Sequence, residues 1–193
     1  MRVKVKTEQR TFNINNIKTR DDTETDVITL TGYASVFNSS TMISDWFEET
    51  IEIGAFARAI SDNNDIRCLF NHDWSHVLGR TKAGTLRLEE DDYGLRFEVT
   101  LPNTTVARDL VESLKRGDIN QCSFGFIPVQ ETWNYDSDPI TRVINDVDLM
   151  EVSIVSLPAY EDTEVDLVRS VTFKEDVEKR KAILKKIKEV QNL

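Results

Sequence analysis

Ile119-Asn-Gln-Cys-Ser-Phe-Gly-Phe-Ile-Pro-Val129 is the stretch from which the fold and the chemistry of this chain are best approached. It is apolar and strand-like, and it carries two small reactive side chains, Cys122 and Ser123, just before an aromatic-glycine-aromatic triplet. Successive residues of a strand face opposite sides, so we expect these two side chains to point away from each other. Gly125 lies two residues beyond Ser123 on the same face and leaves the backbone there accessible. A serine nucleophile fits this pattern if a base reaches its hydroxyl.

Length and composition indicate a globular protein of one domain with appendages. The 193 residues are 39% hydrophobic and 30% charged, with a formal net charge of -10 at pH 7. An acidic balance argues against nucleic acid as a partner, because phosphate binding needs a basic surface. Met1–Glu8 contains no apolar core of signal-peptide length, and no apolar run in the chain is long enough to cross a bilayer. We therefore expect a soluble, intracellular protein with no membrane partner.

The two cysteines, Cys68 and Cys122, both lie in apolar, strand-like runs. A buried free thiol is the usual state of a cysteine in such a run. Two cysteines in a chain of this size do not make a disulfide framework, so a reducing compartment such as the cytoplasm is expected.

Hydrophobic patterning predicts many strands and a few helices. The composition and alternation of the segments favour edge strands near the N-terminus, a loop over residues 38–50, helices at 54–60 and 106–116, and strands at 27–37, 66–70, 85–89, 95–101, 119–129 and 140–157. This order predicts a β-rich α+β fold, a small and mostly antiparallel β-barrel that is closed or nearly closed and surrounded by helices. We predict a principal domain over residues 1–173.

Residues 174–193 differ from the rest of the chain because basic residues outnumber acidic ones there. Ile183, Leu184, Ile187 and Val190 recur at helical spacing, which predicts an amphipathic C-terminal helix. Such a helix either docks on its own domain or binds a partner, and the sequence leaves both interpretations open.

Serine catalysis needs a general base and a third group that orients it. The chain has two histidines, His72 and His76, and His72 follows directly on the apolar run that ends at residue 70. Asp148 and Glu151 are the candidate carboxylates on a later strand. Glu151 stands in a strongly apolar segment, where an unpaired carboxylate is costly, so it either pairs with an imidazole or faces solvent on an edge strand.

Each candidate residue is also compatible with a different role. Ser123 could be an ordinary hydrogen-bonded strand serine, and Cys122 is a second possible nucleophile that faces the other way. His72 and His76 together form an H-x-x-x-H spacing typical of metal sites, but Trp74 and Ser75 between them do not favour a helix, and the chain has no further histidine. A serine hydrolase is therefore a hypothesis at this point, with a metal hydrolase as a weaker one.

Five short motifs, taken together, resemble the prohead (procapsid maturation) serine proteases of tailed bacteriophages, whose fold is similar to that of the herpesvirus protease assemblin. They follow the order of that family and cover about residues 27–165. The motifs are Gly32-Tyr-Ala-Ser-Val-Phe37, Ile53-Gly-Ala-Phe56, Phe70-Asn-His-Asp73 with Leu78-Gly-Arg80, Ser123-Phe-Gly-Phe126, and Leu149-Met-Glu-Val-Ser-Ile-Val-Ser-Leu-Pro-Ala159.

The resemblance implies a Ser-His-Glu triad in which His72 is the general base, Ser123 the nucleophile and Glu151 the acidic member. It also implies a barrel surrounded by helices, a need for neither cofactor nor metal, and a homodimer. The expected substrates are scaffold, the scaffold-like region of the major capsid protein and the enzyme itself, cut inside the immature procapsid in the host cytoplasm. Tyr160 stands where the family usually has asparagine. This difference bears on the shape of that loop and not on the implied triad.

The oxyanion donors, an alternative function and the role of the C-terminal segment complete the expectations from sequence. The donors to the oxyanion are predicted to be the backbone N–H groups near Phe124 or Gly125, or else Arg80. A phage assembly protein that keeps the fold without catalysis is the alternative function. Residues 174–193 are predicted to recruit the protein into the assembling shell.

Overall fold

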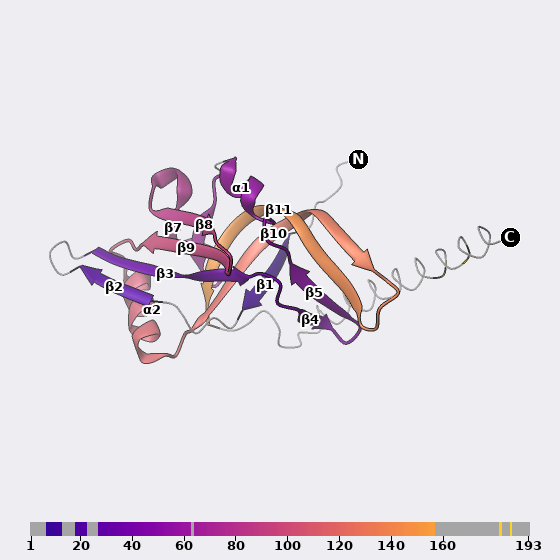
Figure 1. Cartoon of the computed structure of the whole chain (residues 1–193). Helices are drawn as coiled ribbons and strands as arrows, with labels where there is room; N and C mark the ends of the chain where they lie inside the picture. The colour runs from indigo at the N-terminus through magenta and orange to yellow at the C-terminus, as the bar shows by residue number, and fades with distance from the viewer. Residues whose placement is uncertain are drawn as a thin grey trace.

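The computed structural model describes residues 7–12, 18–22, 27–62 and 64–156, together with Ala182 and Lys186. The predicted helix over 174–193 and the domain limit at 173 therefore lie outside the described residues, those two positions apart. The described part contains eleven strands, two α-helices and one 3-10 helix (Figure 1). In chain order these are β1 (Glu8–Phe12), β2 (Lys18–Asp22), β3 (Val27–Val36), β4 (Thr41–Ser44), β5 (Phe47–Ile51), α1 (Ala57–Ser61), β6 (Arg67–Phe70), β7 (Asp73–Arg80), η1 (Thr81–Ala83), β8 (Leu86–Glu90), β9 (Gly94–Thr100), α2 (Thr105–Arg116), β10 (Gln121–Asn134) and β11 (Ile140–Val155).

The strands pair into two sheets. One has the order β1-β10-β11-β5-β4, with β6 beside β11 and β7 beside β6, and the other has the order β2-β3-β9-β8. Most pairs are antiparallel, but β11 runs parallel to both β5 and β6. The predicted β-rich α+β class is thus confirmed. A closed barrel is not found among the pairings of the described residues, so that part of the prediction is not confirmed.

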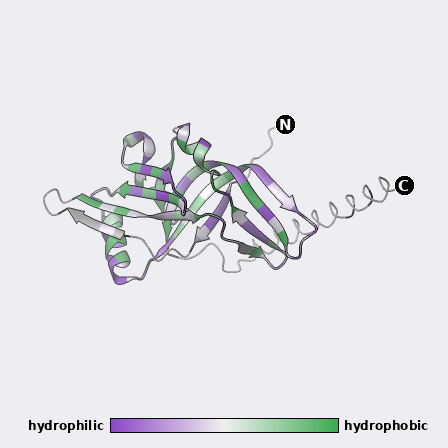
Figure 2. Ribbon diagram, in the orientation of Figure 1, coloured by the Kyte–Doolittle hydropathy of each residue, from purple (hydrophilic) through white to green (hydrophobic). Residues whose placement is uncertain are grey.

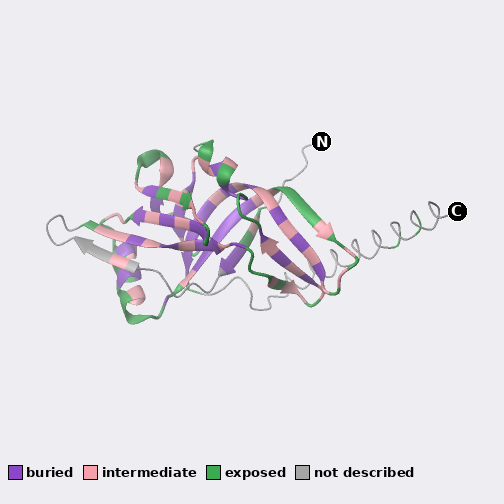
Figure 3. Ribbon diagram, viewed as in Figure 1, coloured by how far each residue is buried: buried purple, intermediate pink, exposed green. Residues whose placement is uncertain are grey.

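The long hairpin of β10 and β11 forms the centre of the larger sheet (Figure 1). The first part of β11, Ile140–Ile144, lies against β5, and a later part, Glu151–Ile154, lies against β6. Burial alternates along the first part, whereas every residue from Glu151 to Val155 is buried (Figure 3). The end of β11 that carries Glu151 therefore has both faces covered.

The main core consists of apolar side chains from both sheets and from the two helices. Hydrophobic and hydrophilic positions alternate along most strands, because alternate residues of a strand face the core (Figure 2). Phe124 and Phe126 of β10 stack with ring centroids 5.0 Å apart, and Phe56 meets Phe124 edge-on at 5.2 Å. Cys68 and Cys122 are buried free thiols, as predicted. No helix in the described ranges is long and apolar enough to cross a membrane.

Helix α2 begins and ends where the sequence predicts. Thr104 is the N-cap, and its hydroxyl accepts a hydrogen bond from the backbone N–H of Ala107 at 3.3 Å. Gly117 ends the helix in the left-handed conformation, with φ 79°. The strands predicted at 27–37, 85–89 and 95–101 are also confirmed as β3, β8 and β9, and the last two pair with each other.

The predicted loop over residues 38–50 is wrong, because this segment forms β4 and most of β5. Phe47, Glu49 and Ile51 alternate inward along β5, and Glu49 is only 3% exposed. A charged residue at an inward position hides the apolar alternation by which a strand is normally identified. Phe47 packs with Trp46 and other aromatic residues in a second, smaller apolar cluster.

Candidate active site

His72 lies in a tight turn between β6 and β7. Asn71 and His72 both have left-handed backbone conformations, with φ 55° and 57°, which non-glycine residues adopt only when surrounding contacts fix them. The Asn71 N–H donates to the carbonyl of Ile154 at 2.9 Å, and the Asn71 side-chain oxygen accepts the N–H of Ser156 at 2.8 Å. The turn is thus tied to the end of β11, the strand that carries Glu151.

The imidazole of His72 and the carboxylate of Glu151 are hydrogen-bonded. Their Nδ1 and Oε1 atoms are 2.7 Å apart. An ionised carboxylate only accepts hydrogen bonds, so Nδ1 carries the proton, and the lone pair of a neutral ring lies on Nε2. Within the described part of the chain, Nε2 is buried and has no hydrogen-bond partner. An imidazole held in this tautomer is suited to accept a proton at Nε2.

Glu151 is 2% exposed, so the alternative that it faces solvent is wrong. Gly125 is its neighbour across the β10–β11 pair, and a methyl group at Gly125 would overlap Oε1 of Glu151. The space left by this glycine holds the carboxylate, which is a different role from the open backbone expected from sequence. Asp148, the other candidate carboxylate, binds Arg58 at 2.7 Å.

Ser153 is a residue of the site that sequence reasoning missed. Its hydroxyl donates to Oε2 of Glu151 at 2.5 Å and accepts the backbone N–H of His72 at 3.3 Å. Because it lies two residues after Glu151 on the same strand, period-two spacing alone could have placed it on the same face.

Ser123 lies on β10 directly opposite Ser153, as the partner of that residue in the antiparallel register. It is fully buried. Its hydroxyl donates to the backbone carbonyl of Arg10 at 2.8 Å and accepts from the hydroxyl of Thr11 at 3.2 Å. The structure therefore brings His72 and Glu151 into contact and puts Ser123 one strand away, hydrogen-bonded to β1 instead of to the imidazole.

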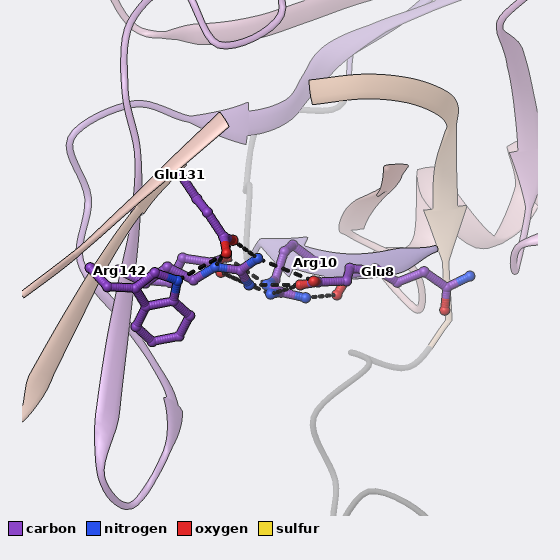
Figure 4. Close-up of polar contacts among 7 residues, drawn as sticks. Glu8, Arg10, Glu131 and Arg142 are labelled. Atoms are coloured by element: carbon purple, nitrogen blue, oxygen red, sulfur yellow. Dashed lines mark hydrogen bonds and ion pairs between the residues drawn. The ribbon is translucent and has the colours of Figure 1, made fainter. Parts of the chain in front are cut away.

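Strand β1 pairs with β10 beside Ser123, and buried and partly buried ion pairs connect it to other strands (Figure 4). Arg10 binds Glu49 at 2.6 Å and Glu8 at 2.5 Å, and Arg142 binds Glu8 and Glu49 at 2.8 Å each and also contacts Glu131. Burial raises the pKa of Glu8, but Arg142 and Arg10 outweigh it, so that this pKa is lowered overall. We call Glu8, Arg10, Glu49, Glu131 and Arg142 the ion-pair cluster.

The other candidates from sequence have different surroundings. Burial raises the pKa of the Cys122 thiol well above its ordinary value, which disfavours a nucleophilic thiolate. His76 pairs with Asp73 at 3.1 Å, and the described residues contain no group of three or more side chains suited to hold a metal ion. Arg80 binds Asp65, and its hydrogen bonds lower the pKa of Asp65 to about 2.

The oxyanion donors proposed near Phe124 and Gly125 stay a prediction. Both residues are paired on two sides, with β1 and with β11. Their backbone groups therefore lie within the sheet, next to the covered hydroxyl of Ser123.

Comparisons with known proteins agree with the motifs. A family model described as caudovirus prohead serine protease matches residues 15–180. The prohead protease of Escherichia phage T5 is 28% identical over 114 residues, which are 59% of this chain and 51% of that protein, so the chain spans about half the length of this curated relative. Among solved structures, the bacteriophage T4 capsid assembly protease, gp21, shares the fold, with a TM-score of 0.53 and 10% identity over 77% of this chain and 96% of that chain. Since the family model matches most of the sequence, the chain belongs to the caudovirus prohead serine protease family.

Proposed function

We propose that this protein is a serine endopeptidase of capsid maturation. Its substrates would be the scaffold or the scaffold-like region of the major capsid protein, and the enzyme itself, inside the immature procapsid. The observation that carries the proposal is the His72–Glu151 hydrogen bond, which leaves Nε2 as the basic nitrogen. Glu151 lies on β11, the strand that pairs with the strand of Ser123. Family membership and the capsid protease neighbour support it. The predicted homodimer belongs to the same proposal.

In the proposed reaction, the Ser123 hydroxyl attacks the carbonyl carbon of the scissile peptide bond while His72 Nε2 takes its proton. The carbon–nitrogen bond then breaks, and the imidazolium gives that proton to the leaving amine. Water hydrolyses the resulting ester with His72 again as the base, which restores the serine. Glu151 holds the imidazole in the required tautomer and stabilises its charged form.

This reaction requires β1 to move. The Ser123 hydroxyl is fully buried and donates to the Arg10 carbonyl, so a substrate carbonyl has no access to it in this arrangement. The same burial is the observation that favours the alternative function, an assembly protein without catalysis. The two functions differ in whether Ser123 becomes reactive.

Replacing Arg10 by alanine is expected to expose Ser123. Arg10 contributes two close ion pairs to the cluster, and truncating one partner of a buried charged pair costs about 3–5 kcal/mol. If β1 opens locally, we expect Ser123 to react with a fluorophosphonate at least about tenfold faster than in the wild type, which corresponds to ~1.4 kcal/mol of lost β1 stability.

The rate of labelling, with the label mapped to Ser123 by peptide mass spectrometry, measures this effect. Arg87→Ala is the matched control, because the Arg87 side chain is 76% exposed on β8. If the β1 amides exchange hydrogen faster in Arg10→Ala but Ser123 is labelled at the wild-type rate, then β1 does not control access to Ser123.

The function itself is tested by coexpressing the chain with the scaffold and major capsid proteins of its phage. Intact mass spectrometry is expected to show truncated products that are absent when the chain is left out. Full-length masses in assembled particles that contain the chain would instead support the assembly protein without catalysis.

A further inference from the structure

We propose that Ser153 is a positioning residue of the proposed triad, which fixes the Glu151 carboxylate and the His72 backbone relative to each other. This inference rests on the proposed function and assigns a fourth side chain to the same site. Ser153 is 2% exposed and contacts both residues. It is neither a member of the proposed acid–base pair nor the proposed nucleophile.

The contacts close a ring of hydrogen bonds. The His72 ring binds one oxygen of Glu151, the other oxygen binds the Ser153 hydroxyl, and that hydroxyl accepts the backbone N–H of His72. The ring begins and ends on His72, so it fixes the imidazole relative to its own backbone. That backbone has φ 57°, a conformation that needs such support in a residue other than glycine.

The direction of the hydrogen bonds in this ring is determined by chemistry. The carboxylate of Glu151 accepts only, so the single hydroxyl proton of Ser153 must point at it, which turns the oxygen lone pairs towards the donating N–H of His72. The second carboxylate oxygen is thereby engaged, and the first stays aimed at Nδ1. Gly125 leaves room for the carboxylate on the β10 side, because a side chain there would overlap it.

The same geometry separates Ser153 from the proposed nucleophile. Its hydroxyl binds the carboxylate on the Nδ1 side of the imidazole, whereas a nucleophile must give its proton to Nε2. Ser153 and Ser123 are direct cross-strand partners, so Ser153 also occupies the place beside the nucleophile on the shared face.

The kinetic test compares Ser153→Ala, Ser153→Thr and Ser61→Ala in cleavage of a peptide that spans a site mapped by coexpression. We expect Ser153→Ala to lower kcat by about 10- to 100-fold with little change in KM, because the acid–base pair loses alignment while the peptide site is untouched. Ser153→Thr keeps the hydroxyl and should recover most of the rate. Ser61→Ala is the matched control, since its exposed hydroxyl donates to the carbonyl of Arg58 on α1.

A second readout does not depend on turnover. The ¹⁵N chemical shifts of the His72 ring report which nitrogen carries the proton, and we expect a single Nδ1–H tautomer in the wild type and a mixture in Ser153→Ala. If Ser153→Ala does not fold, Ser153→Cys, which keeps the shape but donates weakly, is measured in its place. An unchanged kcat and an unchanged tautomer in a folded variant would overturn the inference.

Failure of the inference and failure of the proposed function give different results. If Ser123→Ala is inactive and Ser153→Ala is fully active, only the positioning role is wrong. If Ser123→Ala retains activity, the proposed mechanism is wrong whatever Ser153 does.

Discussion

Ser123→Ala is expected to leave the scaffold, the major capsid protein and the chain itself uncut in coexpression. Loss of the nucleophile of a serine protease lowers kcat by on the order of 10⁶-fold, since the remaining groups cannot form the ester intermediate. At that rate, cleavage during the lifetime of a procapsid is negligible. Intact mass spectrometry of the particles measures the result, with Ser61→Ala as a control that removes an exposed hydroxyl on α1.

The Ser123 variant should still fold, which makes a negative result interpretable. Alanine removes the hydrogen bond to the Arg10 carbonyl and the one from Thr11, each worth about 1 kcal/mol net. We therefore expect a lowered melting temperature with an unchanged circular dichroism spectrum. Normal processing by Ser123→Ala would mean that Ser123 is an ordinary strand serine, as its hydrogen bonds to β1 in this structure permit.

The elements that the sequence predicted well are those determined by local chemistry. Helix α2 has its cap at Thr104 and its terminating glycine at Gly117, both within one turn of the residues that they stabilise. The hairpin of β8 and β9 is joined by a short polar turn. For Glu151 the sequence left two interpretations open, a paired carboxylate or one that faces solvent, and the burial of this end of β11 decides for the pair.

The features that were missed depend on contacts between distant segments. Glu49 is buried because Arg10 and Arg142 surround it, and no local pattern links those three positions. The contact between Ser123 and β1 joins residues more than one hundred positions apart, as in the hydrogen bond to the Arg10 carbonyl. The sequence predicts accessible backbone at Gly125, whereas its role follows from the register that sets it opposite Glu151.

Glu151→Gln is expected to lower kcat by about 10⁴-fold, the magnitude seen when the carboxylate of a serine protease triad becomes an amide. The glutamine can turn its N–H₂ group towards Nδ1 of His72, which moves the ring proton to Nε2 and removes the base. Ser153 would still find an acceptor in the amide oxygen, so the turn that carries His72 should stay in place.

The matched control for Glu151→Gln is Asp148→Asn, which makes the same chemical change three residues earlier on β11. Asp148 binds Arg58, which also binds Asp146 at 2.8 Å, and the Asp148 side chain is 48% exposed, so we expect this variant to cleave at close to the wild-type rate. The pair of variants decides between the two carboxylates that spacing alone leaves open. A large loss in Asp148→Asn with normal cleavage by Glu151→Gln would contradict this assignment. The His72–Glu151 contact would then support the turn and not the reaction, and Asp148 would be the candidate for the acidic member.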